Sequence, residues 1–329
     1  MSKAQLALAL SDLPQIDDSR IIVGRNTADD AGVFRFAPDR ALVHTVDLLA
    51  PVVDDPYTYG RIAAVNSLSD IYAMGGKPLV ALNVIGFPAN LDVNILGDIL
   101  RGGQDEMLEA GGVVLGGHTF QSAEIMYGLA LTGEISPDQI FTNDAAKPGN
   151  LLVLTKALGT GALIQAMMTR GVVTESLYNQ AVSSMTVSNR IAADLMIKHK
   201  AQACTDITGF GFLGHTWEMA EASNVGIDIW AEKLPVFPKI LDLIRDGVTD
   251  SGVQMNRNSF ENNVDFAVDL EPEYAKLLFG SETSGGLLIA IDEKEAEKLV
   301  VDLRDVGLEE SAIVGMIVAE HPGRLTVLL

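Results

Sequence analysis

The sequence predicts an α/β (α+β) protein built from two domains, and three observations support this fold class. Candidate strands and helices alternate through the first half, where several strands are adjacent in the sequence. The length of 329 residues suits two domains better than one. The polar, turn-rich segment 136–150 separates the two halves. We therefore expect an N-terminal helical segment at residues 1–20, a first domain at 21–145 and a second at 146–329.

Apolar runs and the turn residues between them predict the elements of the first half. A helical stretch at 1–12 is followed by short strands at 21–24 and within 26–36, joined by a turn that holds Asp29 and Asp30. Two adjacent acids at such a turn also fit ordinary exposed turn residues. The later elements are a strand from 41 that ends at Asp47, a helix at 56–74, a strand at 78–88, a helix at 91–112, a strand at 113–120 that enters a glycine-rich turn with His118 and Thr119, and a strand at 125–135.

The helix at 56–74 is the element around which the first half is organised. Asp55 is a good N-cap, and proline suits the first helical position because its missing N–H is not needed there. Asn66 and Asp70 are one helical turn apart and share a face. Together with Asp47 they can hold a hard cation. The alternative is a solvated helix face with a capping aspartate.

The second half begins with a strand at 151–154, a turn that holds Lys156 and Gly159, and a helix. Backbone N–H groups and a positive helix end meet there, which suits an anion, although the turn matches neither a Walker A loop nor the dinucleotide fingerprint. A tight turn with a surface lysine is the alternative. The later elements are a helix at 176–200, a short strand before Asp206, a helix from 213, a strand at 225–237, a helix at 237–247, a loop at 251–263, a turn at 280–286 that leads into a strand, a helix at 294–307, and final strands at 315–320 and 324–329.

Composition and charge restrict the classes of function. A net charge of −21 argues against nucleic acid as a partner, since a phosphate backbone would be repelled. We find no apolar stretch long enough for a membrane span and no secretory signal, so a cytoplasmic location is expected. The one cysteine, Cys204, excludes an intrachain disulfide and a cysteine-based metal cluster. We expect Cys204 to be a buried structural thiol.

Four acids recur in one context, beside glycine or small-residue turns at strands or on a helix: Asp30, Asp47, Asp70 and Asp206. Carboxylates gathered without cysteine or paired histidine indicate magnesium, not zinc. Magnesium held by carboxylates indicates a substrate that carries phosphate. A Ser/His/Asp hydrolase fits poorly, because the sequence has no GxSxG elbow.

The motifs NTADDAGV, NSLSDIYAMGGKP, GGHT, YGLALTG, LTKALGTG, TDITGFGFLGH and TSGGLL occur in this order. Together they resemble selenophosphate synthetase (selenide, water dikinase), a family in the aminoimidazole ribonucleotide synthetase superfamily. The resemblance extends from about Ile21 to the end of the chain. It implies a two-domain fold of that superfamily, a homodimer formed through the N-terminal sheets, and ATP bound through magnesium ions between the domains.

The resemblance also assigns residues. The metal-binding aspartates of the family match Asp30, Asp47, Asp70 and Asp206. Asn66 matches an active-site asparagine and is the catalytic candidate. Asp30, Asp47, Asn66, Asp70, His118, Thr119 and Lys156 are the implied ATP-binding set. The implied reaction transfers the γ-phosphate of ATP to selenide, and hydrolysis then leaves selenophosphate, AMP and phosphate.

The sequence departs from the family pattern in two places. Family members carry, before the first strand, a glycine-rich loop with a reactive Cys or selenocysteine and a Lys three residues later. Neither residue is matched here, because Lys3 is out of register and Cys204 lies elsewhere. Gly280, Ser281 and Glu282 replace the family's Asp-Pro and Gln before TSGG. Three interpretations remain open: a fragment from which the N-terminal loop was removed, a natural domain whose missing part lies in a preceding fusion partner, or a paralogue that binds ATP but no longer makes selenophosphate. A thiamine-monophosphate kinase is a weaker alternative.

Overall fold

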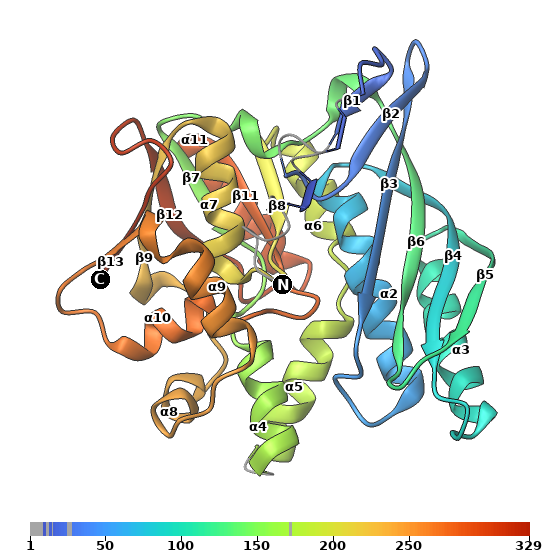
Figure 1. The fold of residues 1–329 in the computed structure, drawn as a ribbon. Coiled ribbons are helices and arrows are strands. Elements are labelled where there is room, and N and C mark those ends of the chain that lie inside the picture. Colours follow the sequence, from blue (N-terminus) through green and yellow to red (C-terminus); the bar gives the residue numbers. More distant parts are fainter. Residues whose placement is uncertain (1–8, 11–12, 15, 25–27, 171–172) are drawn as a thin grey trace.

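The computed structural model describes residues 9–10, 13–14, 16–24, 28–170 and 173–329 (Figure 1). Most of the helix expected at 1–12 lies outside this part. The described residues between 13 and 20 form turns and irregular structure, so the helical segment expected at 1–20 does not extend over them. No helix in the described ranges is both long enough and apolar enough to cross a membrane.

The first half forms a mixed sheet whose described strands have the order β1-β2-β3-β6-β4-β5. All neighbouring pairs are antiparallel except β4 and β5. The strand β3 continues through Asp47 to Leu49, so Asp47 does not end it, and the expected turn at His118 and Thr119 is part of the strand β5. The bounds are β1 Ile21–Val23, β2 Gly32–Ala37, β3 Arg40–Leu49, β4 Lys77–Phe87, β5 Val113–Gln121 and β6 Met126–Ile135.

Two helices, α2 (Pro56–Ala73) and α3 (Val93–Glu109), pack against this sheet and each other. The Asp55 side chain accepts a hydrogen bond from the N–H of Thr58, which confirms the predicted N-cap. The helices approach so closely that a Cβ at Gly60 would lie 2.1 Å from the carbonyl oxygen of Ile99. Residues on every side of α2 are buried, because the helix lies between the first sheet and the second half (Figure 1).

The second half forms another mixed sheet, with the described strands in the order β10-β13-β9-β12-β7-β11-β8. The strand β8, which ends at Asp206, is therefore an edge strand, and its neighbour is β11. The bounds are β7 Asn150–Leu154, β8 Ala203–Asp206, β9 Gly226–Trp230, β10 Val264–Phe266, β11 Leu287–Asp292, β12 Ala312–Val318 and β13 Leu325–Leu328.

The helices of the second half differ from the sequence prediction in three places. The helix expected at 176–200 is two helices, α5 and α6, with a break at 187–189. The segment 251–263, expected as a loop, contains α9, and α10 was not predicted. The bounds are α4 Thr160–Arg170, α5 Glu175–Thr186, α6 Arg190–Lys198, α7 Gly211–Ser223, α8 Ile240–Arg245, α9 Gly252–Phe260, α10 Pro272–Phe279 and α11 Glu293–Asp305, with short 3₁₀ turns at Pro137–Gln139, Asn143–Ala145, Ala231–Lys233 and Glu261–Asn263.

One of the two hydrophobic clusters in the described chain is shared by both halves. It contains Ile62, Leu68 and Ile71 of α2 together with Met196 of α6 and Cys204 of β8. The helix α2 accordingly contacts α5, α6 and β8 directly. The two sheets are therefore joined through α2, and the aspartates of the first half are held close to the edge strand β8.

Candidate active site

The four predicted aspartates come from separate elements that meet at this junction. Asp30 precedes β2, Asp47 lies on β3, Asp70 lies in α2, and Asp206 ends β8. The hydroxyl of Thr205 donates to Asp30 Oδ1 over 2.8 Å, which ties the segment before β2 to β8. The structure therefore brings together carboxylates that are up to 176 positions apart in the sequence (Asp30 to Asp206).

Neighbouring side chains fix the orientation of the two carboxylates that α2 and β3 supply. The Thr45 hydroxyl donates to Asp70 Oδ2, and the Asn66 amide donates to Asp47 Oδ2. The backbone N–H of Leu48 adds a second bond to Asp47, over 3.2 Å. These hydrogen bonds restrict the orientations of the Asp47 and Asp70 carboxylates.

Burial and mutual repulsion disfavour the ionised forms of these acids. Burial raises the pKa of Asp30 and of Asp70 well above the ordinary range, and the charge of Asp206 raises both further. Burial raises the pKa of Asp206 to about 6, against a lowering effect from a Ser69 hydrogen bond. Burial also raises the pKa of Asp47, while hydrogen bonds from Leu48 and Asn66 oppose the shift. A positive charge placed among these groups would relieve the repulsion.

The donor set fits a hard divalent cation such as Mg²⁺. Asp30 Oδ2 and Asp206 Oδ2 are buried and have no hydrogen-bond partner among the described residues. Such oxygen atoms are the ligands that Mg²⁺ prefers. Within the described ranges, no three His, Cys, Asp or Glu side chains form a ready-made metal group.

Asn66 connects the aspartates to a loop of the second half that we call the 282–286 loop (Glu282–Gly286). While its amide nitrogen donates to Asp47, its Oδ1 accepts the backbone N–H of Ser284 over 3.0 Å. The Asn189 amide donates to the Gly285 carbonyl over 2.9 Å and to the Ser69 hydroxyl over 2.8 Å. Two buried amides, one from each half, thus hold this loop against α2.

Lys156 also holds this loop. Its ammonium group is buried and donates to the carbonyl oxygens of Val187, at 2.6 Å, and Ser284, at 2.9 Å. Burial lowers the pKa of Lys156 to about 7, and the charge of Asp206 opposes the shift. The alternative of a surface lysine is therefore wrong. The bond to Val187 also lies at the break between α5 and α6.

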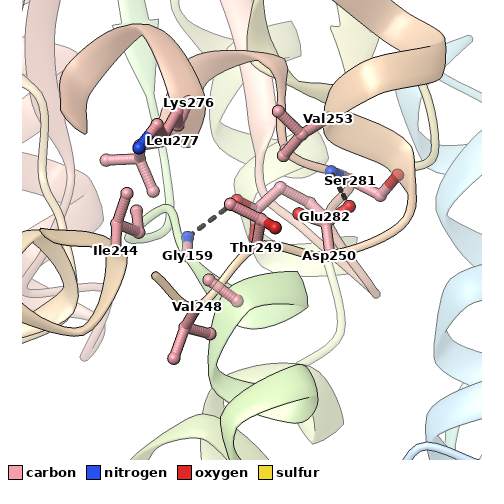
Figure 2. Close-up of a pocket in the computed structure, with 12 residues that line it drawn as sticks. Gly159, Ile244, Val248, Thr249, Asp250, Val253, Lys276, Leu277, Ser281 and Glu282 are labelled. Carbon is pink, nitrogen blue, oxygen red and sulfur yellow. Dashed lines mark hydrogen bonds between the residues drawn. The ribbon is translucent and has the colours of Figure 1, made fainter. Parts of the chain in front are cut away.

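The anion at the predicted strand–turn–helix site is a side chain of the protein itself. Glu282 accepts a hydrogen bond from the N–H group of Gly159 at 2.7 Å (Figure 2). It also accepts hydrogen bonds from the N–H group of Thr160, at 2.9 Å, and from the Thr160 hydroxyl, at 2.5 Å. These groups form the N-terminus of α4, where a negative charge is favoured. Nothing in the sequence pairs Glu282 with Thr160, which are 122 positions apart, so this contact was not predicted.

A small cavity of ≈ 10 Å³ lies beside Glu282, large enough for about one water molecule. Asp250 also lines this cavity and accepts the backbone N–H of Ser281 over 3.3 Å (Figure 2). It accepts the backbone N–H of Gly252 over 2.7 Å as well. Burial raises the pKa of Glu282 to about 7, and the charge of Asp250 adds to the shift, while the bonds from Gly159 and Thr160 lower it. The region around the α4 N-terminus is therefore filled by the protein's own acids.

Within one chain, His118 and Thr119 lie away from the junction of the four aspartates. They lie exposed on β5, which is separated from β3 by β6 and β4. Cys204 is fully buried on β8, and burial raises the pKa of its thiol well above the ordinary value. This burial confirms the prediction that Cys204 lies in the core and agrees with a structural role.

Two family models match the chain: the N-terminal domain of AIR synthase related proteins at residues 28–135, and the C-terminal domain of the same class at 147–328. These matches define the chain as an AIR synthase related protein. The chain is 45% identical over 322 residues to a selenide, water dikinase from Pelobacter propionicus, covering 98% of this chain and 92% of that protein. It is 42% identical to one from Clostridioides difficile, covering 98% and 93%. The chain belongs to the selenide, water dikinase family.

Solved structures of lower identity share the fold. Thiamine monophosphate kinase from Aquifex aeolicus superposes with a TM-score of 0.69 at 19% identity, covering 98% of this chain and 96% of that one. Hydrogenase maturation protein HypE in complex with ATP superposes with a TM-score of 0.65 at 18% identity, covering 99% and 91%. These likenesses confirm the predicted two-domain α/β architecture and carry no argument about the substrate.

Proposed function

We propose that this chain is an ATP-dependent phosphotransferase that converts ATP, selenide and water into selenophosphate, AMP and phosphate. The observation that carries the proposal is the junction of Asp30, Asp47, Asp70 and Asp206, with buried oxygen atoms left unpaired among the described residues. The relatives at 42–45% identity named selenide, water dikinase support the choice of selenide as the phosphate acceptor.

Magnesium ions, held by the four aspartates, would neutralise the negative charge of the polyphosphate. The residues of this chain set up that site in advance. Thr45 and Thr205 orient Asp70 and Asp30, and Asn66 fixes both Asp47 and the 282–286 loop. Lys156 acts on the site by holding the Ser284 carbonyl. Burial lowers the local dielectric constant, which strengthens every charge interaction with a bound polyanion.

The test is phosphorus NMR of the purified chain with ATP, Mg²⁺ and selenide under anaerobic reducing conditions. Equal amounts of selenophosphate and AMP are expected, and an Asp70→Asn variant, which keeps the side-chain shape but removes one charge, serves as the inactive control. Broadening of the ATP resonances without AMP would contradict turnover and support the ATP-binding paralogue. Conversion of thiamine monophosphate to the diphosphate would support the kinase alternative.

We also propose that the chain forms a homodimer through its first sheet. Val46, Leu82 and Phe120 are 58%, 47% and 44% exposed, and the strand register places them on the face away from α2. An apolar face of this kind requires a cover, and a second copy with the same face supplies one. Leu82→Glu is expected to shift the mass measured by light scattering from dimer to monomer, and an unchanged mass would contradict this interface. A reducing compartment such as the cytoplasm suits the proposed selenide chemistry.

A further inference from the structure

The hydroxyl group of Ser284 is buried. The side chain is 1% exposed, and its Oγ has no hydrogen-bond partner among the described residues. An unpaired buried hydroxyl costs free energy, because it has lost its water without gaining another partner. The atoms that share this condition include Asp30 Oδ2 and Asp206 Oδ2, both in the proposed active site.

The backbone of Ser284 is strained and held on both sides. Its φ is 50°, in the left-handed region that favours glycine. Asn66 accepts its N–H, and Lys156 donates to its carbonyl oxygen. Glycines occupy the next two positions, where Gly285 packs so tightly that a Cβ would lie 2.0 Å from the Ile207 carbonyl oxygen. Glycine at position 284 would relieve the strain, so a serine there keeps its side chain at an energetic cost.

The contacts of Ser284 place it beside the aspartates. Asn66, which binds its N–H, also binds Asp47. The following residues pair with the end of β8, since the N–H of Ile207, next to Asp206, donates to the Gly286 carbonyl over 2.9 Å. The negative charge of Asp206 raises the pKa of Lys156, whose ammonium group donates a hydrogen bond to the Ser284 carbonyl. Ser284 is therefore linked to Asp47 through Asn66, and it lies two residues before Gly286, which pairs with the residue that follows Asp206.

We propose that Ser284 is a further substrate-binding residue, whose hydroxyl donates a hydrogen bond to a β- or γ-phosphate oxygen of the nucleotide held at the aspartates. This inference rests on the proposed function. A phosphate oxygen supplies an acceptor that the described part of the chain does not, and a hydrogen bond to a charged group is among the stronger ones. Because Asn66 and Lys156 hold the backbone of Ser284, the loop is positioned before the nucleotide binds, which lowers the entropy cost of binding.

The test compares Ser284→Ala, which removes the hydroxyl and keeps the strain, with Ser284→Gly, which removes both. Calorimetry with ATP and with AMP, each with Mg²⁺, measures the affinities. Both variants are expected to bind ATP about 10- to 100-fold more weakly and AMP as the wild type does. Ser281→Ala is the matched control: its hydroxyl, in the same segment, already donates to the Gly209 carbonyl over 2.8 Å, and its ATP affinity is expected to remain unchanged.

Two results would overturn the inference while leaving the proposed function intact. Wild-type ATP affinity in both Ser284 variants would show that the hydroxyl makes no contact with the nucleotide. Equal losses for ATP and AMP would show a structural effect of the loop. Failure of the wild-type chain to bind ATP with Mg²⁺ would instead overturn the proposed function, and the inference with it. A higher melting temperature for Ser284→Gly than for Ser284→Ala would report the relief of backbone strain independently of any ligand.

Discussion

Glu282 offers a test of how the N-terminus of α4 is stabilised. Burial raises the pKa of Glu282 from 4.5 to about 7 in the folded chain. Between these pH values the folded state binds the proton more tightly than the unfolded state, so the contribution to stability is fully present below pH 4.5 and is lost as pH rises through 7. A pKa shift of this size contributes about 3 kcal/mol to the unfolding free energy at low pH, and about 2 kcal/mol of this contribution is lost above pH 5.5.

The measurement is the difference in unfolding free energy between the wild type and Glu282→Gln. Urea unfolding can be followed through Trp217 and Trp230, both in the second half. Glutamine cannot titrate, so the unfolding free energy of Glu282→Gln is expected to rise by about 2 kcal/mol relative to that of the wild type between pH 5.5 and 8. The other titrating groups are the same in both proteins, so their contributions cancel in this difference. A difference that does not change with pH would refute the reasoning and show that the bonds from Gly159 and Thr160 keep the carboxylate ionised. Glu282→Ala leaves two N–H groups unpaired and is expected to cost about 2–6 kcal/mol at every pH.

Three further predictions concern the proposed site. Asp70→Ala is expected to abolish Mg²⁺-dependent ATP binding in calorimetry, because it removes a charge from the centre of the aspartates; unchanged affinity would contradict the metal assignment. Asn66→Ala loses the bonds to Asp47 and to the 282–286 loop, so ATP affinity is expected to fall about 10-fold and the unfolding free energy by about 1–3 kcal/mol, whereas an effect on stability alone would limit Asn66 to a structural role. Cys204→Ser is expected to leave ATP binding and turnover almost intact, and the native thiol should not react with a thiol reagent until the chain unfolds; a large loss of turnover in a folded variant would contradict the structural role.

Capping residues, helix breakers and apolar periodicity predicted those helices whose limits depend on neighbouring residues in the sequence. Asp55, Pro56 and the Gly75-Gly76 pair gave the correct limits of α2, because caps and breakers act within a few residues. The helix expected at 176–200 failed at 187–189, where Asn189 and the Val187 carbonyl make contacts with distant residues instead of continuing one helix. The helix α9 was missed because its sequence, GVQMNRNSF, is polar and lacks an apolar period.

For the candidate site, too, some features were predictable from the sequence and others were not. Family motifs pointed to Asp30, Asp47, Asp70 and Asp206, and the fold brings them to one junction. The arrangement around them was not predictable, because it depends on single contacts across long separations. Ser284 and Asn66 are 218 positions apart, and Lys156 and Ser284 are 128 apart. One sequence contains no signal that pairs such residues, so the role of the 282–286 loop emerged only from the structure.

The hydrophobic cluster shared by both halves has a consequence for biosynthesis. During translation the first sheet and α2 leave the ribosome well before α6, β8 and α11, whose side chains complete the same cluster. A nascent chain that ends near residue 145 therefore exposes the apolar surface of α2 that faces the second half, and it is open to aggregation until more than a hundred further residues are made. The first half expressed alone should need a chaperone or the missing half, supplied as a separate polypeptide, to remain folded.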